Sequence, residues 1–512
     1  MFDAGDGDDS AAADVRLAVL TEKPADAGFF TSAGARGMIY SRIYSLSAGE
    51  MARNEHIEKL RLLLSRGPAK ASAIMDALVI SQSTLSRLWQ SIPDGVVLGA
   101  GKTRQYALQR QVPGAMAPLP LFCVSDDATV TVTGNLAPLE GGFYVLTHAN
   151  ARAYRLYQGI PWFLSDLRPH GFLGRFEPRR HRDLGLPDDI RTWTDEHVLQ
   201  YLARRSENAA GNLILGNESY ARYMLDRSRR RESLIPQARR AELYPVMARQ
   251  VMQGEPPGSS AGGEQPKFTA MVERSAGDLI EHVMVKFSPP TSTPGGRRWG
   301  DLLVCEHLAL AVLARNGIAA ATTSILESGD RVFLEVVRVD RVGLEGRRPM
   351  ATFEAFDGEL GMLDQRWTAV ALEMERSGKL AGDDVATVAI LDLYGALIGN
   401  TDRHHGNIAV TWTADGKRCL VEAYDMLPML YRPTAHGEVI EQEWVPHLTA
   451  RLDLHHFDAC CRMALVFWED VMVDPRISRE FKMDVARLHM NALHHLAPGT
   501  ATHASPQTEK GA

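Results

Sequence analysis

A polar loop in the second half of the chain, TDRHHGN at residues 401–407, constrains the fold more than any other feature of the sequence. It follows the apolar run AILDLYGALI, which predicts a buried helix, and it precedes IAVTW, which predicts a strand. A second strand-like run, RCLVEAY, begins after residues 414–417, whose sequence ADGK is typical of a hairpin turn. The order helix, loop and hairpin therefore places Asp425, directly after the second run, next to Asp402 and Asn407.

These three residues predict phosphoryl-transfer chemistry. Asp402 and Asn407 have the D-x-x-x-x-N spacing of kinase catalytic loops, in which Asp accepts the proton of the nucleophile and Asn binds a metal. Two carboxylates and a carboxamide at one edge suit Mg²⁺, which neutralises phosphate charge. The neighbouring His404 and His405 do not indicate zinc, because adjacent histidines point to different sides and no nearby Cys/Glu pair completes a tetrahedral site.

A buried lysine and a buried glutamate are predicted upstream. Lys286 lies inside the apolar strand-like run IEHVMVKF, where an amine needs a partner. Glu306 lies in the middle of the apolar stripe of a predicted helix, GDLLVCEHLALAVLARNG, and a carboxylate there needs a cation. A strand lysine paired with a helix glutamate is how protein kinases position the ATP phosphates. The alternatives are an edge strand with Lys286 in water and a position at the helix rim for Glu306.

A loop rich in small residues, GEPPGSSAGGEQPKF at 254–268, leads into the first of two predicted antiparallel strands. Such loops let backbone N–H groups approach phosphate oxygens, because glycine tolerates positive φ and adds no bulk. This loop matches neither GxGxxG nor GxxxxGK[ST], so a flexible linker remains an alternative.

The segment 51–111 predicts a winged helix-turn-helix, because three short helices precede a basic hairpin, VVLGAGKTRQYAL. From Arg53 to Arg110 it carries nine Lys/Arg and four Asp/Glu, a charge of +5 in an acidic protein. We expect major-groove contacts from the third helix and phosphate contacts from the hairpin; the residues are Ser83, Thr84, Ser86, Arg87 and Gln90, and Lys102 and Arg104. A helical dimerisation or docking module is the alternative.

Other segments predict less chemistry. QVPGAMAPLPL at 111–121 predicts a linker, residues 123–250 mix strand-like and helical pieces, and the arginine-rich segment 222–240 predicts a solvated helix face. The chain has five cysteines and no CxxC pair, which predicts no disulfide framework and a reducing, cytoplasmic setting. No apolar run reaches the roughly 18–20 residues of a membrane span. The acidic N-terminus lacks a secretory signal, and Met38 and Met51 are alternative starts.

Four motifs in order, SSAGGEQPKF, MVKFS, GNTDRHHGN and EAYDMLP, resemble the HipA-like serine/threonine kinases of bacterial toxin–antitoxin systems over roughly residues 120 to 490. With the predicted winged helix, the whole chain resembles the YjjJ-type subgroup of that family. The resemblance implies an α+β, protein-kinase-like, two-lobed fold with ATP between a β-rich N-terminal part and a helical C-terminal part. We expect six segments: disordered ends at 1–50 and 499–512, a winged helix-turn-helix at 51–111, a HipA N-terminal-like subdomain at 112–250, a kinase N-lobe-like region at 251–345 and a helical kinase C-lobe at 346–498.

The resemblance also implies ATP and Mg²⁺ as cofactors and assigns roles by motif position. The catalytic group is Asp402 as base, with Lys286, Glu306 and His404; the metal ligands are Asn407 and Asp425; and the ATP-binding residues are Gly262, Gly263, Gln265, Lys267, Lys286, Val337, Val339 and Asn407. Ser260 matches the serine whose autophosphorylation ejects the glycine-rich loop and inactivates the kinase. Val337 and Val339 depart from the charged or aromatic residues often seen at the hinge, and the loop lacks an HRD triplet.

The partners implied are a protein substrate such as an aminoacyl-tRNA synthetase, DNA bound through residues 51–111, and an antitoxin. Two other functions stay open. A small-molecule phosphotransferase of aminoglycoside- or choline-kinase type would need an acidic or aromatic acceptor pocket and no DNA-binding module. A DNA-binding regulator with a degenerate, nucleotide-sensing kinase part is disfavoured by the intact Lys286, Asp402, Asn407 and Asp425.

Overall fold

The computed structural model describes residues 48–149, 153–253, 265–274, 279–356, 360–362, 365–413, 416–445 and 453–496. The predictions of disorder for 1–50 and 499–512 therefore fall, apart from 48–50, outside the described residues. The described chain divides into two compact units: an N-terminal unit of residues 48–121 and 132–161, and a C-terminal unit of residues 122–131 and 162–496. Both units combine helices with mainly antiparallel sheets, so the predicted α+β class is confirmed.

The N-terminal unit begins with the predicted helices and hairpin. Its elements are α1 (Ala48–Leu64), β1 (Ala69–Lys70), α2 (Ala71–Leu78), α3 (Gln82–Trp89), β2 (Gly95–Leu98) and β3 (Gln105–Leu108). The strands form an antiparallel sheet in the order β1-β3-β2. Ser81 caps α3 by accepting a hydrogen bond from the Thr84 amide, as Ser at an N-cap is expected to do.

A second sheet in the same unit packs against the hairpin. It contains β5 (Val130–Leu139), β6 (Phe143–His148) and β7 (Tyr154–Gln158), which are antiparallel neighbours. Leu98 and Ala107 of the hairpin share one buried cluster with Leu139 and Val145 of the sheet. Gly141, at the turn after β5, has φ 74°, and a Cβ there would lie 2.4 Å from the backbone of Arg66.

Residues 111–121 are not the linker that their composition predicts. They enter β4 (Leu119–Val124) at Leu119, and Val112, Leu119 and Leu121 are buried. The Pro and Gly content suggested an exposed connection, but the apolar residues between them pack into the protein. The end of β4 pairs with β8 (Leu213–Leu215) in the C-terminal unit. The α-helices of this part of the unit are α4 (Trp162–Ser165), α5 (Gly171–Gly174), α6 (Glu177–Arg180), α7 (Asp195–Arg205) and α8 (Asn217–Arg229).

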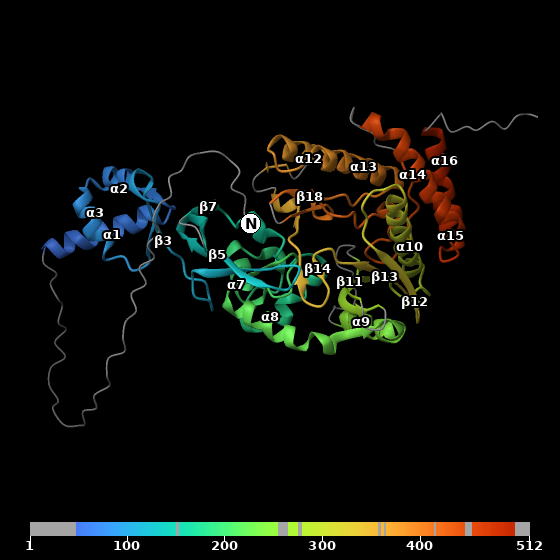
Figure 1. Cartoon of the computed structure of the whole chain (residues 1–512), viewed down its shortest axis with the longest axis horizontal. Coiled ribbons are helices and arrows are strands. Elements are labelled where there is room, and N and C mark those ends of the chain that lie inside the picture. Colours follow the sequence, from blue (N-terminus) through green and yellow to red (C-terminus); the bar gives the residue numbers. More distant parts are fainter. Residues whose placement is uncertain are drawn as a thin grey trace, which may run out of the picture. The chain divides into compact units, whose positions relative to one another are not determined.

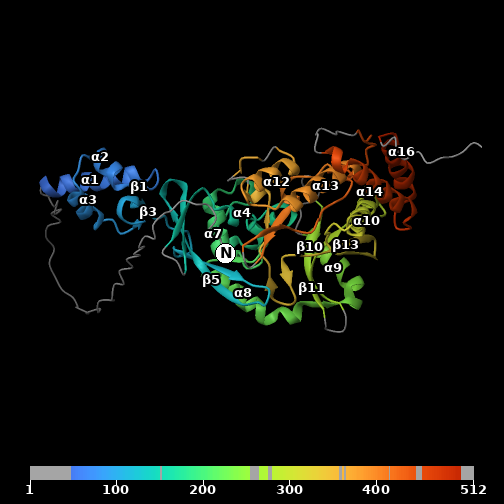
Figure 2. The ribbon, with the colours of Figure 1, turned by 45° about the horizontal axis from the view of Figure 1, so that its top comes forward.

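The central feature of the C-terminal unit is a five-stranded sheet in the order β12-β13-β11-β10-β9. The strands are β9 (Leu234–Pro236), β10 (Lys267–Glu273), β11 (Ile280–Phe287), β12 (Thr323–Ser328) and β13 (Arg331–Val337). Side chains of α9 (Arg240–Gln253), including Tyr244, pack on one face of the sheet with Phe268 and Val285. On the other face, Leu303 of α10 (Pro294–Arg315) packs against Leu334. The sheet is therefore covered by a helix on each face (Figure 2).

The C-terminal half of this unit is mostly helical. It holds α12 (Trp367–Arg376), α13 (Gly382–Ile398), α14 (Asp453–Val473), α15 (Arg479–Phe481) and α16 (Arg487–Leu496). In Figures 1 and 2, α14 and α16 lie side by side and next to α10. The described part of the same half also contains two small sheets. One is formed by β16 (Ala351–Thr352), β17 (Ala409–Trp412) and β18 (Arg418–Leu420), and the other by β14 (Arg341–Val342) and β15 (Gly346–Arg347).

Two predicted boundaries are corrected. Helix α10 begins at Pro294, six residues before the predicted start, because Thr293 caps it by accepting from the Gly296 amide and Pro294 suits the first turn. Strand β18 ends at Leu420 rather than Tyr424, because Ala423 pairs with Ala320 instead of extending the pairing with β17. None of the helices in the described ranges is long and apolar enough to cross a membrane.

Candidate active site

Lys286 and Glu306 form a buried ion pair. Lys286 Nζ donates to Glu306 Oε1 at 2.6 Å and to Oε2 at 2.8 Å. The two residues are 5% and 0% exposed, and β11 has a neighbour on each side, so both the edge strand and the helix rim are excluded. Burial alone would lower the pKa of Lys286, but the charges of Asp425 and Glu306 raise that pKa above its ordinary value, and the amine stays protonated.

Asp425 completes this cluster. Its Oδ1 accepts a hydrogen bond from Lys286 Nζ, and its backbone has φ 55°, a conformation uncommon for a residue other than glycine. Burial opposes ionisation of this carboxyl, but the charges of Lys286 and Lys267 hold its pKa below the usual range. Lys267 stands opposite Lys286 in the ladder between β10 and β11. The cluster therefore combines two carboxylates with two lysines on neighbouring strands.

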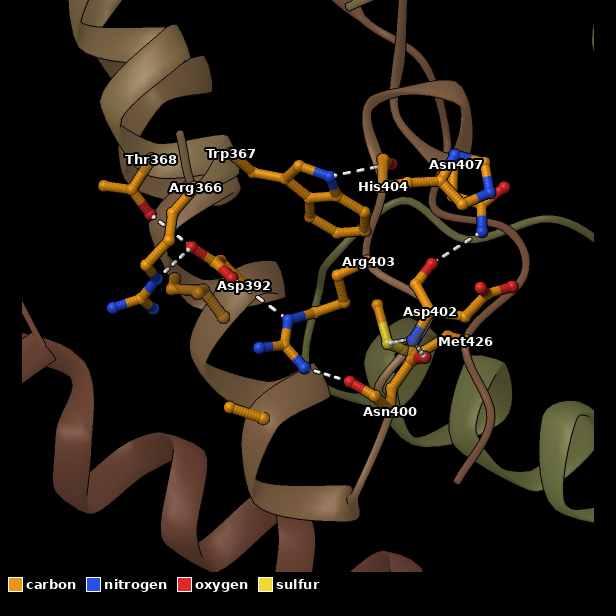
Figure 3. A network of polar contacts seen from close by, with 12 residues as sticks. Arg366, Trp367, Thr368, Asp392, Asn400, Asp402, Arg403, His404, Asn407 and Met426 are labelled. Carbon is orange, nitrogen blue, oxygen red and sulfur yellow. Dashed lines mark hydrogen bonds and ion pairs between the residues drawn. The ribbon is translucent and has the colours of Figure 1, made fainter. Parts of the chain in front are cut away.

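Hydrogen bonds between side chains and the backbone of Asp402 hold the predicted catalytic loop (Figure 3). The Asp402 amide donates to Asn400 Oδ1 at 2.9 Å, and Asn407 Nδ2 donates to the Asp402 carbonyl at 2.8 Å. In Figure 3 the Asp402 carboxylate points away from Arg403 and Asp392. Because Nδ2 of Asn407 is used in this bond, its Oδ1 is the atom suited to hold a cation.

Both loop histidines have structural contacts. The His404 carbonyl accepts from Trp367 Nε1 at 3.0 Å, and its ring Nδ1 accepts from the Gly406 amide at 3.1 Å. His405 is buried, and its ring Nε2 lies 2.9 Å from the carbonyl oxygen of Gln365. The exposed His404 thus caps the short 3₁₀ turn that carries Asn407.

Asn400 is a residue that the sequence reasoning missed. It is 1% exposed, and besides accepting from the Asp402 amide it donates from Nδ2 to the Asp425 carbonyl at 3.4 Å. One side chain therefore links the loop of Asp402 to the segment of Asp425. A polar residue between the helix end at Gly399 and Asp402 was the available signal.

Asp392 is the second missed residue. It lies on α13, is 2% exposed, and accepts from Arg403 Nε at 3.1 Å, from Arg366 Nε at 3.0 Å and from Thr368 Oγ1 at 3.1 Å. Arg403 also donates to the Asn400 carbonyl. Figure 3 shows this chain of contacts from the start of α12 through Asp392 to the loop. An acid within the apolar run AILDLYGALI carries the same signal that identified Glu306.

A cavity of about 1190 Å³ opens onto the cluster. Many of the predicted site residues line it: Lys267, Lys286, Glu306, Val337, Val339, Asn407 and Asp425. At the predicted hinge, the amides of Val337 and Arg338 donate to the carbonyls of Thr322 and His282, so these two N–H groups are engaged within the protein. Gln265 is buried, and its Nε2 has no hydrogen-bond partner among the described residues. Ser260, Gly262 and Gly263 lie outside those residues.

The predicted DNA-contacting residues all belong to the N-terminal unit. Ser83, Arg87, Lys102 and Arg104 are exposed, Thr84 is half-buried, and the side chain of Leu85 points instead into the core of the unit. The exposed face of α3 therefore carries the polar residues that the sequence assigned to it.

Two family models and a named relative match this chain. The model of the YjjJ-like toxin middle domain matches residues 115–224, and that of the HipA-like C-terminal domain matches residues 259–479. The toxin YjjJ of Escherichia coli K12 is 32% identical over 429 residues, which are 83% of this chain and 95% of that protein. This chain belongs to the YjjJ-type subgroup of the HipA-like toxins. The resemblance predicted from the four motifs is thus confirmed.

Solved structures similar to this HipA-like chain include two more distant proteins. Shewanella oneidensis HipA, in a complex with HipB and operator DNA, is 14% identical with a TM-score of 0.41, and the match covers 74% of this chain and 96% of that one. The Helicobacter pylori proinflammatory kinase CtkA is 13% identical with a TM-score of 0.27, and the match covers 48% of this chain and 96% of CtkA.

The donor atoms at this HipA-like site fit Mg²⁺. Asp425 offers a carboxylate and Asn407 an amide oxygen, both hard oxygen ligands, and both residues line one cavity. Within the described ranges no three His, Cys, Asp or Glu side chains cluster as a metal site. Two protein ligands suffice for Mg²⁺, because it keeps several water molecules and binds largely through substrate phosphates.

Proposed function

We propose that this HipA-like chain is an ATP- and Mg²⁺-dependent serine/threonine protein kinase. The observation that carries the proposal is the buried contact of Lys286 with both Glu306 and Asp425, on the wall of the cavity that Asn407 also lines. Protein kinases use a strand lysine, a helix glutamate and a metal-binding aspartate in this combination to position ATP.

The residues divide the reaction between them. Lys286 places its protonated amine on the phosphates, and Glu306 holds that amine in position. Asp402 accepts the proton of the acceptor hydroxyl while the hydroxyl oxygen bonds to the γ-phosphorus and the bond from that phosphorus to ADP breaks. Asp425 and Asn407 hold Mg²⁺, which supplies charge neutralisation for the phosphates. His404 supports the loop rather than taking the proton, since its ring nitrogen accepts from the Gly406 amide.

The proposal extends to regulation and partners. Ser260 of the glycine-rich loop is the proposed site of autophosphorylation, with Gly262, Gly263, Gln265 and Lys267 close to the phosphates and the backbone of Val337 to Val339 at adenine. The N-terminal unit is the proposed DNA-binding module, supported by the exposed polar face of α3 and by Lys102 and Arg104. The proposed acceptor is a protein, such as an aminoacyl-tRNA synthetase. The family membership supports, as part of the same proposal, an antitoxin partner and a cytoplasmic location.

Incubation of the purified protein with Mg²⁺ and γ-labelled ATP, followed by mass spectrometry, tests this function. We expect label on Ser260 or a neighbouring serine, and none in Asp425→Asn. Nucleotide binding without label transfer to this chain or to an added protein would instead favour a nucleotide-sensing DNA-binding regulator. Transfer to a small alcohol or amine, with no protein labelled, would favour a small-molecule phosphotransferase.

A further inference from the structure

Four arginines gather around one carboxylate beside the predicted hinge. Arg338 donates to Asp340 Oδ1 at 3.0 Å and Oδ2 at 2.8 Å, and Arg341 donates to the same Oδ2 at 2.6 Å. Arg230 and Arg347 lie near them, and their charges act on the guanidinium of Arg341. Four guanidinium groups against one carboxylate leave three positive charges without a counter-charge among these residues.

Among the described residues, the acids beside this arginine cluster (Arg230, Arg338, Arg341 and Arg347) form no ion pair with it other than those of Asp340, although Glu207 and Asp226 line the same cavity. Arg230 and Arg347 lie 4.9 Å and 4.8 Å from the centre of the buried Tyr223 ring, which is neutral. The nearby carboxylate of Glu345 is already paired with Arg227. The remaining strong contacts of the cluster are to backbone carbonyls, such as those of Ala209, Gly211 and Glu207.

Burial and the positive charge of the cluster lower the pKa values of Arg341 and His282. Burial, and then the charges of Arg338, Arg347 and Arg230, lower the pKa of Arg341 well below its ordinary value, although Asp340 opposes this shift. Burial and the charges of Arg341 and Arg338 also lower the pKa of His282 to about 4, so this imidazole is neutral at pH 7. Uncompensated buried charge is unfavourable, and a bound anion would relieve it.

Arg347 adds a second observation. It is 1% exposed, and in the described part of the chain its Nε and Nη1 have no hydrogen-bond partner, although a guanidinium buried in a protein ordinarily satisfies its donors. Arg347 therefore adds a positive charge to the cluster.

The cluster opens onto the cavity and is separate from the triphosphate site. Arg230, Arg338 and Arg341 line the same cavity as Lys286. Lys286 pairs with Leu334 across the sheet, and Arg338 follows Leu334 by four residues, so the backbone of Arg338 lies about 13 Å from that of Lys286 along the strand direction. An anion at the cluster is thus not a phosphate held by Lys286.

We propose that Arg230, Arg338 and Arg341 form an anion subsite for the phosphate or diphosphate group of a small-molecule ligand other than the triphosphate of ATP. Guanidinium groups suit such a group because their planar donors match phosphate oxygens. The subsite goes beyond the proposed kinase reaction, because a ligand there would occupy the cavity on the hinge side of Lys286.

Calorimetric titration of inorganic pyrophosphate into the full chain, in buffer without Mg²⁺, tests the subsite. We expect saturable binding that Arg230→Met weakens at least about tenfold, that Arg230→Lys weakens less, and that Arg231→Gln leaves unchanged. Arg231 is the matched control, because it is the next arginine along the chain and is exposed. Thermal unfolding of each variant shows whether Arg230→Met has kept its fold.

Lys286→Met separates the subsite from the proposed ATP site. We expect this variant to retain pyrophosphate binding, even if it no longer transfers phosphate. Absence of binding to the wild-type chain would overturn the proposal. Equal binding by Arg230→Met and wild type, or loss of binding in Lys286→Met alone, would also overturn it, because the anion would then lie at Lys286.

Discussion

Asn400 connects the two acidic residues of the proposed site. Its side chain touches the backbone of both Asp402 and Asp425, so the relative position of the base and the metal ligand depends on one buried carboxamide. The positive φ of Asp425 adds to this dependence, because an unfavourable backbone conformation persists only when surrounding contacts hold it.

Replacing Asn400 with Ala should therefore lower kcat more than it raises KM for ATP. We expect kcat to fall about 10- to 100-fold, and stability to fall by about 1–3 kcal/mol because the Asp402 amide loses a partner inside the protein. Steady-state kinetics and denaturant unfolding measure both effects. Thr401→Ala is the control, since Thr401 is the exposed neighbour. An unchanged kcat in Asn400→Ala would show that Asn400 does not position the loop.

The sequence predicted Lys286 and Glu306, whose burial conflicts with their charge, although Asp392 has the same conflict and was missed. Lys286 and Glu306 could be found because each lies in an apolar pattern and each needs the other. Asn400 could not be found in this way, because a neutral carboxamide in a polar loop gives no such conflict. The arginine cluster was missed because Arg230 follows exposed residues of α8 and looks solvated, although it is buried.

At the scale of elements, Asp392 joins α12, α13 and the catalytic loop. Arg366 and Thr368 reach it from the start of α12, and Arg403 reaches it from the loop. The side chain of Arg403 also packs against Gly395 of α13. A Cβ atom at position 395 would come 2.7 Å from the Cδ atom of Arg403. The helix face thus provides both the charge and the space that the loop arginine requires.

Neutralising Asp392 should loosen this junction. In Asp392→Asn two arginines lose their shared carboxylate, and we expect stability to fall by about 3 kcal/mol and kcat to fall more than ATP affinity. Asp383→Asn, an exposed acid in the first turn of the same helix, should change neither quantity. Equal kcat values for the two variants would contradict a positioning role for Asp392.

His489 ties α16 to the end of α13 and should make stability fall in mild acid. Its ring is buried, Nε2 lies 2.8 Å from the Leu397 carbonyl, and Nδ1 lies 2.7 Å from the Tyr431 hydroxyl. Burial lowers the pKa of His489 to about 3, so the folded state keeps the ring neutral while the unfolded chain binds a proton below about pH 6.5.

The contribution of His489 to the free energy of unfolding is therefore fully present above about pH 6.5. It decreases as the pH falls, by about 2 kcal/mol between pH 7 and pH 5. His282, whose pKa is lowered to about 4, contributes with the same sign. Unfolding curves at pH 7 and pH 5 should show that His489→Gln removes about 2 kcal/mol of the pH-dependent loss. An equal loss in both proteins would mean that His489 titrates alike in the folded and unfolded states.

At the scale of the whole molecule, the proposed DNA binding and phosphoryl transfer belong to different units. Motif order predicted the family and the helical, hairpin and sheet elements. It did not predict that the hairpin shares a core with β5–β7, because Leu98 and Ala107 look like ordinary strand residues and the following segment resembles a linker. Contacts between elements distant in sequence leave no local pattern when both sides are merely apolar.

Arg87→Ala combined with Lys102→Ala should weaken DNA binding while phosphoryl transfer stays unchanged. We expect the slope of log K against log salt to decrease in magnitude by about 1 to 2, since up to two phosphate contacts disappear. Arg53→Ala with Lys59→Ala removes the same charge from α1 and serves as the control. Equal DNA affinity in the double variant would refute the proposed interface, and a loss of phosphoryl transfer would refute the separation of functions.

The most direct test of the proposed reaction is a single-turnover transfer of labelled phosphate from ATP by Asp402→Asn, with nucleotide affinity measured on the same preparation. Asn keeps the size of the side chain and the backbone contacts to Asn400 and Asn407 but cannot accept the proton. We predict a rate at least about 100-fold lower, with ATP affinity changed by less than about threefold. Transfer at the wild-type rate would contradict the assignment of Asp402 as the base and with it the proposed site.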